Sequence, residues 1–156
     1  MNQVEISPVR DAEVEAVVAL WRRTGLVRPW NDPHRDLELA RRHSSSEVLV
    51  ARREDEVLGV VLVGLDGHRG WIYYLAVDPD QQRRGLGRTL VTEAETWLVD
   101  RGAPKVQLMV RSENTLVVDF YRALGYQAQD CLVLGRRLDG REAPGATPDP
   151  AVSGPH

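Results

Sequence analysis

Cysteine, lysine and long apolar runs are scarce in this chain of 156 residues. Cys131 is the single cysteine, which excludes an intrachain disulfide framework. Lys105 is the only lysine and the net charge is −3, so the surface as a whole has no attraction for nucleic acid or an anionic membrane. The best apolar run, Val57 to Leu65, is interrupted by glycines and falls short of the roughly 20 residues that cross a bilayer. We therefore expect no nucleic-acid partner and no membrane partner.

The composition favours one domain. A hydrophobic content of 42% and a charged content of 28% are ordinary for a globular protein, and the length allows a sizeable core. The segment 139–156 is rich in Pro, Gly and Ala and has little to bury, so we expect a disordered tail after a single domain at 1–138. Neither end has the pattern of an export signal, and a cytoplasmic location is the expectation.

Apolar periodicity predicts an α/β arrangement of short strands and amphipathic helices. The predicted strands are Val4–Ile6, Val48–Ala51, Val57–Leu65, Trp71–Val77, Val106–Val110 and Leu132–Leu138. The predicted helices follow Asp11, run from Asp32-Pro33 towards His43, and span Leu86–Leu98 and Asn114–Leu124. Asp11 and Asp32 are the expected N-caps, and Gly25, Gly102 and Gly125 are the expected stops. The three consecutive strands within 48–77 indicate an antiparallel meander.

Residues 82–87, Gln-Arg-Arg-Gly-Leu-Gly, lie where the strand Trp71–Val77 gives way to a helix. Glycines allow close approach to the backbone, and the first turn of a helix presents unpaired N–H groups and the positive end of the dipole. Arg83, Arg84 and Arg88 add formal positive charge. The junction therefore predicts a diphosphate site, although a basic turn before a helix is the plainer interpretation of the hexapeptide alone.

Two common phosphate motifs do not match this junction. A P-loop requires lysine and a hydroxyl residue directly after its glycines, but Arg88 and Thr89 follow Gly87 at the wrong spacing. A dinucleotide fingerprint requires a third glycine, where this chain has Leu90. Nicotinamide or flavin binding is therefore disfavoured.

The segment resembles the Q/R-x-x-G-x-G/A element of the GNAT superfamily of N-acetyltransferases, and the predicted order of elements matches that fold outside the tail. Two further stretches, 28–33 (Arg-Pro-Trp-Asn-Asp-Pro) and 66–70 (Asp-Gly-His-Arg-Gly), are similar to the small bacterial YpeA-like acetyltransferases. The resemblance implies a mixed central sheet with helices on both faces. It also implies acetyl-CoA as cosubstrate, an amine acceptor and no metal.

The resemblance assigns cofactor contacts to named positions. It implies that backbone groups of Leu75, Ala76 and Val77 bind the pantetheine arm and the thioester carbonyl, where an N–H would stabilise an oxyanion. It implies that the diphosphate binds at Gln82, Arg83, Arg84, Gly85, Leu86, Gly87 and Arg88, with Asn114 as a further contact. Without the resemblance, the strand residues read as core and Asn114 as an ordinary N-cap.

Tyr121 is the catalytic residue that the resemblance implies. A departing thiolate needs a proton, and a phenol with an ordinary pKa near 10 is protonated at neutral pH and can donate one. The alternative interpretation makes Tyr121 an amphipathic-helix residue. The base that deprotonates the amine is not identified, because Trp71 stands where some family members have a glutamate; His68, Asp66, Glu113 and Tyr73 are substitutes by location.

The acceptor is expected to bind the first loop and helices. The expected contacts are Trp30, Asn31, Asp32, His68 and Tyr73, with His34 nearby. Trp30 also fits a role as a core plug, and capping fully explains Asp32 before Pro33. An amine-bearing small molecule and a peptide or protein acceptor both remain open, as does a homodimer. The alternative function is a non-catalytic acyl-CoA sensor; for the enzyme, direct attack in a ternary complex is favoured over an acyl-enzyme at Cys131.

Overall fold

A computed structural model describes residues 3–141, which form one five-stranded sheet with the order β1-β2-β3-β4-β5. The strands are β1 (Glu5–Pro8), β2 (Ser46–Arg53), β3 (Glu56–Leu65), β4 (Gly70–Val77) and β5 (Val106–Leu108). The first four pair antiparallel, and β5 pairs parallel to β4. The predicted meander and the mixed sheet are confirmed.

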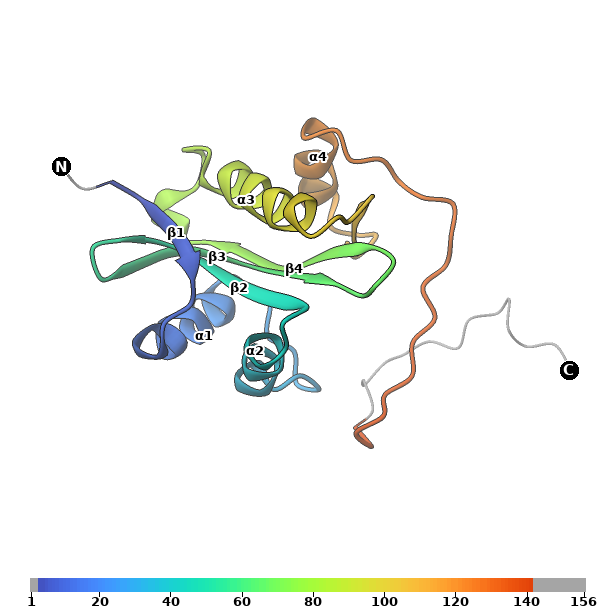
Figure 1. Cartoon of the computed structure of the whole chain (residues 1–156), viewed down its shortest axis with the longest axis horizontal. Helices are drawn as coiled ribbons and strands as arrows, with labels where there is room; N and C mark the ends of the chain where they lie inside the picture. Colours follow the sequence, from blue (N-terminus) through green and yellow to red (C-terminus); the bar gives the residue numbers. More distant parts are fainter. Residues whose placement is uncertain (1–2, 142–156) are drawn as a thin grey trace, which may run out of the picture.

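Helices cover both faces of the sheet (Figure 1). The helices α1 (Val14–Arg23) and α2 (Pro33–Arg42) lie on one face, and α3 (Leu86–Asp100) and α4 (Thr115–Ala123) lie on the other. Strand residues alternate between the two resulting cores: Val60 packs with Trp21 of α1, whereas Val61 packs with Leu90 of α3. Within residues 3–141, no helix combines the length and the apolar character that crossing a membrane requires.

Most of the predicted helix signals are confirmed. Asp32 caps α2, because its Oδ1 accepts hydrogen bonds from the backbone N–H groups of His34 and Arg35 at 3.1 and 3.2 Å. Gly25 follows α1 in the left-handed region with φ of 74°, a conformation that glycine adopts without steric cost. Gly102 has φ of 81° at the same place after α3.

The prediction that Asp11 caps the first helix is wrong. Asp11 starts a short 3-10 turn, Asp11–Glu13, and α1 begins only at Val14. The carboxylate of Glu13 accepts the backbone N–H of Arg10 at 2.8 Å, while Asp11 pairs with Arg41 of α2 at 2.5 Å. The longer glutamate side chain reaches back over the turn, which frees the aspartate for the neighbouring helix.

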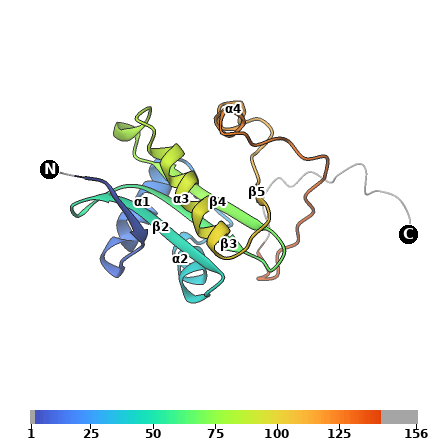
Figure 2. The same ribbon diagram turned by 45° about the horizontal axis from the view of Figure 1, so that its top comes forward.

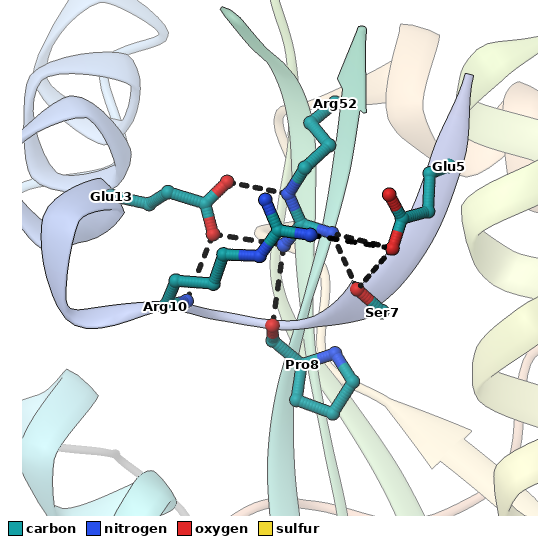
Figure 3. A network of polar contacts seen from close by, with 6 residues as sticks. All are labelled: Glu5, Ser7, Pro8, Arg10, Glu13 and Arg52. Atoms are coloured by element: carbon teal, nitrogen blue, oxygen red, sulfur yellow. Dashed lines mark hydrogen bonds and ion pairs between the residues drawn. The ribbon is translucent and has the colours of Figure 1, made fainter. Parts of the chain in front are cut away.

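Glu13 also forms a buried ion pair with Arg52 of β2 (Figure 3). Arg52 Nε and Nη2 donate to the two carboxylate oxygens of Glu13 at 2.5 and 2.8 Å. The same guanidinium donates to the Ser7 hydroxyl and to the Pro8 carbonyl oxygen. One arginine therefore connects β1 and the turn before α1 to β2, and the carboxylate of Glu13 compensates its positive charge.

The predicted strand Leu132–Leu138 does not form. This segment runs extended and away from the sheet after α4 (Figure 2), and within residues 3–141 no strand pairs with the outer edge of β5. Leu132, Leu134 and Leu138 are 76%, 75% and 93% exposed. A run of apolar residues indicates an extended conformation but does not specify a pairing partner. The neighbouring strand β5 is also shorter than predicted, because it ends at Leu108 rather than at Val110. Of the predicted tail, residues 142–156 lie outside the described residues.

Candidate active site

The strands β4 and β5 separate after a short contact. They pair only at Gly70 with Val106, Trp71 with Gln107 and Ile72 with Leu108. From Tyr73 to Val77, the edge of β4 that faces β5 has no strand partner among the described residues. The backbone of Leu75, Ala76 and Val77 therefore borders an opening in the sheet, where unpaired N–H and C=O groups can bind a ligand.

A bulge lies at the start of this opening. Between Val60 and Leu62 of β3, the register of β4 shifts from Ala76 to Tyr73, so β4 holds one extra residue. Tyr74 has φ of 54°, which is unusual for a bulky residue. Trp21 Nε1 donates to the Tyr74 carbonyl oxygen at 3.2 Å, and the Tyr74 hydroxyl donates to Asp36 Oδ2 at 2.6 Å. Both α1 and α2 thus fix the bulge.

The Gln82–Arg88 turn leads from β4 into α3 as the sequence predicts. Gly85 has φ of 81° at the cap of α3, and Arg83 has φ of 66°, so two left-handed residues expose the backbone of the turn. Gln82 Nε2 donates to the Val77 carbonyl oxygen at 3.3 Å and ties the turn to the end of β4. Arg83, Arg84 and Arg88 are exposed, and none has an ion-pair partner among residues 3–141.

The geometry of this turn fits a diphosphate. The first turn of α3 presents backbone N–H groups, no acidic residue lies in that turn, and a Cβ added at Gly85 would meet nothing within 4 Å. Gly87 is different, because a Cβ there would lie 3.4 Å from the Phe120 ring of α4. The first glycine thus leaves open space outside the turn, whereas the second faces the Phe120 ring at ordinary contact distance.

Tyr121 of α4 lies beside β5 in an open groove of about 810 Å³ that Trp71, Glu95 and Tyr126 also line. The residue is 7% exposed, and burial raises the pKa of its phenol to about 12. Its hydroxyl has no hydrogen-bond partner within residues 3–141. Neither Leu75–Val77 nor Gln82–Arg88 lines this groove; the two regions meet through Phe120, which packs edge to face on Tyr121 and contacts Gly87.

Asn114 serves as the N-cap of α4. Its Oδ1 accepts the backbone N–H of Val117 at 3.4 Å, a weak capping bond. The same position follows β5 and precedes Tyr121 by two helical turns, so the cap and the phenol belong to one short element. The capping interpretation accounts for this contact. The side-chain NH2 group of Asn114 remains available to a ligand.

Trp30, Asn31 and Asp32 share the loop between α1 and α2. The Arg111 guanidinium carbon lies 5.9 Å from the Trp30 ring centroid, so this loop reaches the segment that follows β5. Arg137 Nη1 donates to Asn31 Oδ1 at 3.2 Å. The backbone N–H of Arg35, followed by that of His34, holds the pKa of Asp32 below its usual value. Half-buried Trp30 is not a core plug.

His68 does not belong to that loop. His68 lies in the turn between β3 and β4, at the opposite end of β4 from the glycine turn. Asp66 organises this turn: its Oδ1 accepts the N–H groups of His68 and Arg69, and its Oδ2 accepts Trp71 Nε1 at 3.0 Å. These bonds lower the pKa of Asp66 to about 2, which makes it a weak base. Burial raises the pKa of Tyr73.

Sequence reasoning missed the contacts among Trp21, Asp36 and Tyr74. Tyr74 reads as one more apolar strand residue beside Tyr73, and a bulge leaves no periodic signature in one strand. Trp21 reads as part of the apolar stripe of α1, which it is, and only the fold reveals that its N–H meets a carbonyl of β4.

Comparisons with known proteins agree with this architecture. The sequence profile described as the acetyltransferase (GNAT) family matches residues 14–126. An acetyltransferase of Pectobacterium atrosepticum is 45% identical over 135 residues, which cover 86% of this chain and 96% of that protein. Among solved structures, the aminoglycoside N-acetyltransferase AAC(6')-Iy in complex with CoA has a TM-score of 0.75 at 16% identity, covering 88% of this chain and 97% of its own.

An aminoglycoside acetyltransferase from an uncultured soil metagenomic sample, in complex with sisomicin, has a TM-score of 0.70 at 20% identity. The match covers 86% of this chain and 95% of that protein. At these identities the structural likeness defines the fold. The profile and the relative from Pectobacterium define the family: this chain belongs to the GNAT family of acetyltransferases. It is therefore an acyltransferase with the GNAT fold.

Proposed function

We propose that the protein transfers the acetyl group of acetyl-CoA to an amine in a ternary complex. The observation that carries this proposal is the path of β4, whose unpaired edge at Leu75–Val77 leads directly into the left-handed, arginine-flanked turn before α3. A thioester arm and a diphosphate would then lie along one continuous stretch of backbone. Acetyl-CoA has a thioester at one end, which the pantetheine arm joins to a diphosphate, and it supplies the acyl group when bound.

Each part of the path has a physical role. The backbone N–H groups around Gly85 and the guanidinium groups of Arg83, Arg84 and Arg88 bind the diphosphate by charge-assisted hydrogen bonds. Backbone groups of Leu75–Val77 orient the arm, and an N–H aimed at the thioester carbonyl stabilises the charge that develops on its oxygen. Loss of one such donor costs roughly 3 kcal/mol in other enzymes.

Tyr121 acts as the general acid in this proposal. Its phenol is protonated across the physiological range because burial raises the pKa to about 12. The hydroxyl is free of protein partners among residues 3–141, so its proton can go to a departing thiolate. Tyr126, its neighbour in the groove, donates instead to Glu95 Oε2 at 3.0 Å and is committed to that bond.

The amine must lose a proton before it attacks. Among the candidate bases, Asp66 is disfavoured by its low pKa and its three bonds, and Tyr73 by a raised pKa that keeps its phenol protonated, which leaves His68 and Glu113. Direct attack needs no acyl-enzyme. Cys131 is exposed in the extended segment after α4; it lines the groove of Tyr121 but belongs to none of the elements that border the opening of the sheet.

The decisive measurement is release of free CoA thiol from acetyl-CoA in the presence of amines, amino acids, polyamines and peptides, with calorimetric titration of CoA alongside. Amine-dependent release supports the proposal. Tight CoA binding without release from any acceptor would favour an acyl-CoA sensor. Absence of CoA binding would overturn the role of Gln82–Arg88.

A further inference from the structure

A second open cleft, of about 520 Å³, lies on the loop between α1 and α2. Three of its lining residues are arginines from separate parts of the chain: Arg22 at the end of α1, Arg28 in the loop, and Arg141 after the extended segment. The other lining residues are Val27, Pro29, Asn31, Asp32, Pro33 and His34. Basic groups thus converge on one surface depression of a protein whose net charge is −3.

The acidic groups near this cleft are already engaged. Asp32 accepts the N–H groups of His34 and Arg35 and lies 3.7 Å from Arg35 Nε. Glu15 contacts His34 Nε2 at 3.0 Å. Within residues 3–141, the side chains of Arg22, Arg28 and Arg141 form no ion pair and no hydrogen bond. The cleft therefore holds three guanidinium groups against the one carboxylate of Asp32, which interacts electrostatically with Arg141, and it keeps an excess of positive charge.

The loop that carries the cleft is anchored near both strands of the opening in the sheet. At one end of this loop, Trp21 stacks on Tyr74 of the β4 bulge. At the other end, Asp36 of α2 accepts the Tyr74 hydroxyl, and Trp30 in between lies under Arg111, just after β5. A molecule held in the cleft would thus lie on the loop that connects the β4 bulge with the segment after β5.

We propose that this cleft binds a carboxylate or phosphate group of the acceptor, so that the acceptor is an amine that also carries an anionic group. Guanidinium groups bind such anions in bidentate geometry. The same charges would repel a polycationic amine. The identification of the bound molecule as the acceptor rests on the proposed function. Binding of an anion to the cleft can be measured without turnover.

The binding test uses CoA-saturated protein, in which the Gln82–Arg88 turn is filled. The Nε–Hε resonances of Arg22 and Arg28, assigned with the R22A and R28A variants, are followed during titration with N-acetyl-L-alanine, with uncharged N-acetyl-L-alaninamide, and with inorganic phosphate. We expect either anion to shift these two resonances saturably while Arg53, at the end of β2, stays unchanged and the amide has no effect. Equal shifts at Arg53, or no shift with either anion, would overturn the proposal.

The kinetic test compares acceptors matched except for charge: alanine with alaninamide, and phosphoethanolamine with ethanolamine. Arg28→Ala and Arg22→Ala should raise KM for the anionic acceptor roughly 10- to 100-fold, the cost of a lost charged hydrogen bond, with kcat and the KM of acetyl-CoA little changed. Arg53→Ala is the control. Preference for spermidine over every anionic amine would overturn the inference. Anion binding without any acetyl transfer would retain the site and refute the proposed function.

Discussion

The indole of Trp21 donates its N–H to the carbonyl oxygen of Tyr74 at 3.2 Å, and the two rings stack with centroids 4.1 Å apart. Tyr74 is the left-handed residue of the β4 bulge, and its own hydroxyl donates to Asp36. Two helices thus hold a strained residue directly before Leu75, the first of the three backbone positions proposed to bind the thioester arm. Strain of this kind persists only where surrounding contacts impose it.

Trp21→Phe should therefore impair the site, because it removes the indole N–H and leaves a void where the fully buried indole stood. The substitution leaves the Tyr74 carbonyl without its donor, which should lower the free energy of unfolding by about 1 to 3 kcal/mol and raise the KM for acetyl-CoA severalfold. Urea unfolding and steady-state kinetics measure the two effects. Trp97→Phe is the control, because Trp97 packs against the core on the opposite face of the sheet and stacks under Arg101. Loss of stability with an unchanged KM would limit Trp21 to a structural role.

The buried pair of Glu13 and Arg52 predicts an acid-sensitive fold. Burial alone raises the pKa of Glu13, but its bonds to Arg52 and Arg10 outweigh burial and lower it below the ordinary 4.5. The unfolded chain therefore binds the proton more tightly, so the pair stabilises the fold above pH 4.5 and this contribution is lost as pH falls through the depressed pKa. Glu13→Gln should lower the free energy of unfolding at pH 7 by about 3 kcal/mol and flatten its acid dependence.

Chemical denaturation from pH 3 to 8 measures this dependence. Exposed Glu56 begins β3, and Glu56→Gln should leave both the stability and its acid dependence unchanged. A Glu13→Gln protein as stable as the wild type at pH 7 would show that the pair is replaceable.

Sequence patterns predicted the elements that bury one clear face, since Leu90 and Leu98 in α3, or Val60 and Val61 in β3, encode burial through their spacing. They failed where the outcome depends on a distant partner. Leu132–Leu138 has the composition of a strand but lies beside no edge, and Asp11 has the chemistry of a cap but meets Arg41. For the site, the turn at Gly85 is a local signal, whereas the contact of Trp21 with Tyr74 spans 53 residues and leaves none.

Tyr121→Phe should lower kcat roughly 100-fold or more, because the departing thiolate loses its proton donor, and should leave CoA affinity unchanged. Since the pKa of Tyr121 is about 12, ionisation of this phenol should not reduce the wild-type rate up to pH 10. Any rise of rate with pH then reports deprotonation of the amine or its base.

Tyr126→Phe is the matched control for this prediction. It removes a phenol from the same groove, one that is bonded to Glu95, so it should cost about 1 kcal/mol of stability with little change in kcat. Stopped-assay thiol release between pH 6 and 10 compares the three proteins. Equal rates for the wild type and Tyr121→Phe would remove Tyr121 from the acid role.

Gly85 and Gly102 stand at opposite ends of α3 with the same φ of 81°, and a Cβ added at either meets nothing within 4 Å. Gly85→Ala and Gly102→Ala should therefore lose the same stability, about 1 to 2 kcal/mol, from left-handed strain alone. Only Gly85→Ala adds a methyl group where the diphosphate would approach, so it alone should raise the Kd for CoA, by about 10-fold or more if one charged hydrogen bond is lost. Calorimetric titration of both variants separates strain from contact: equal Kd values would show that the turn at Gly85 does not bind the diphosphate, whatever the stability loss.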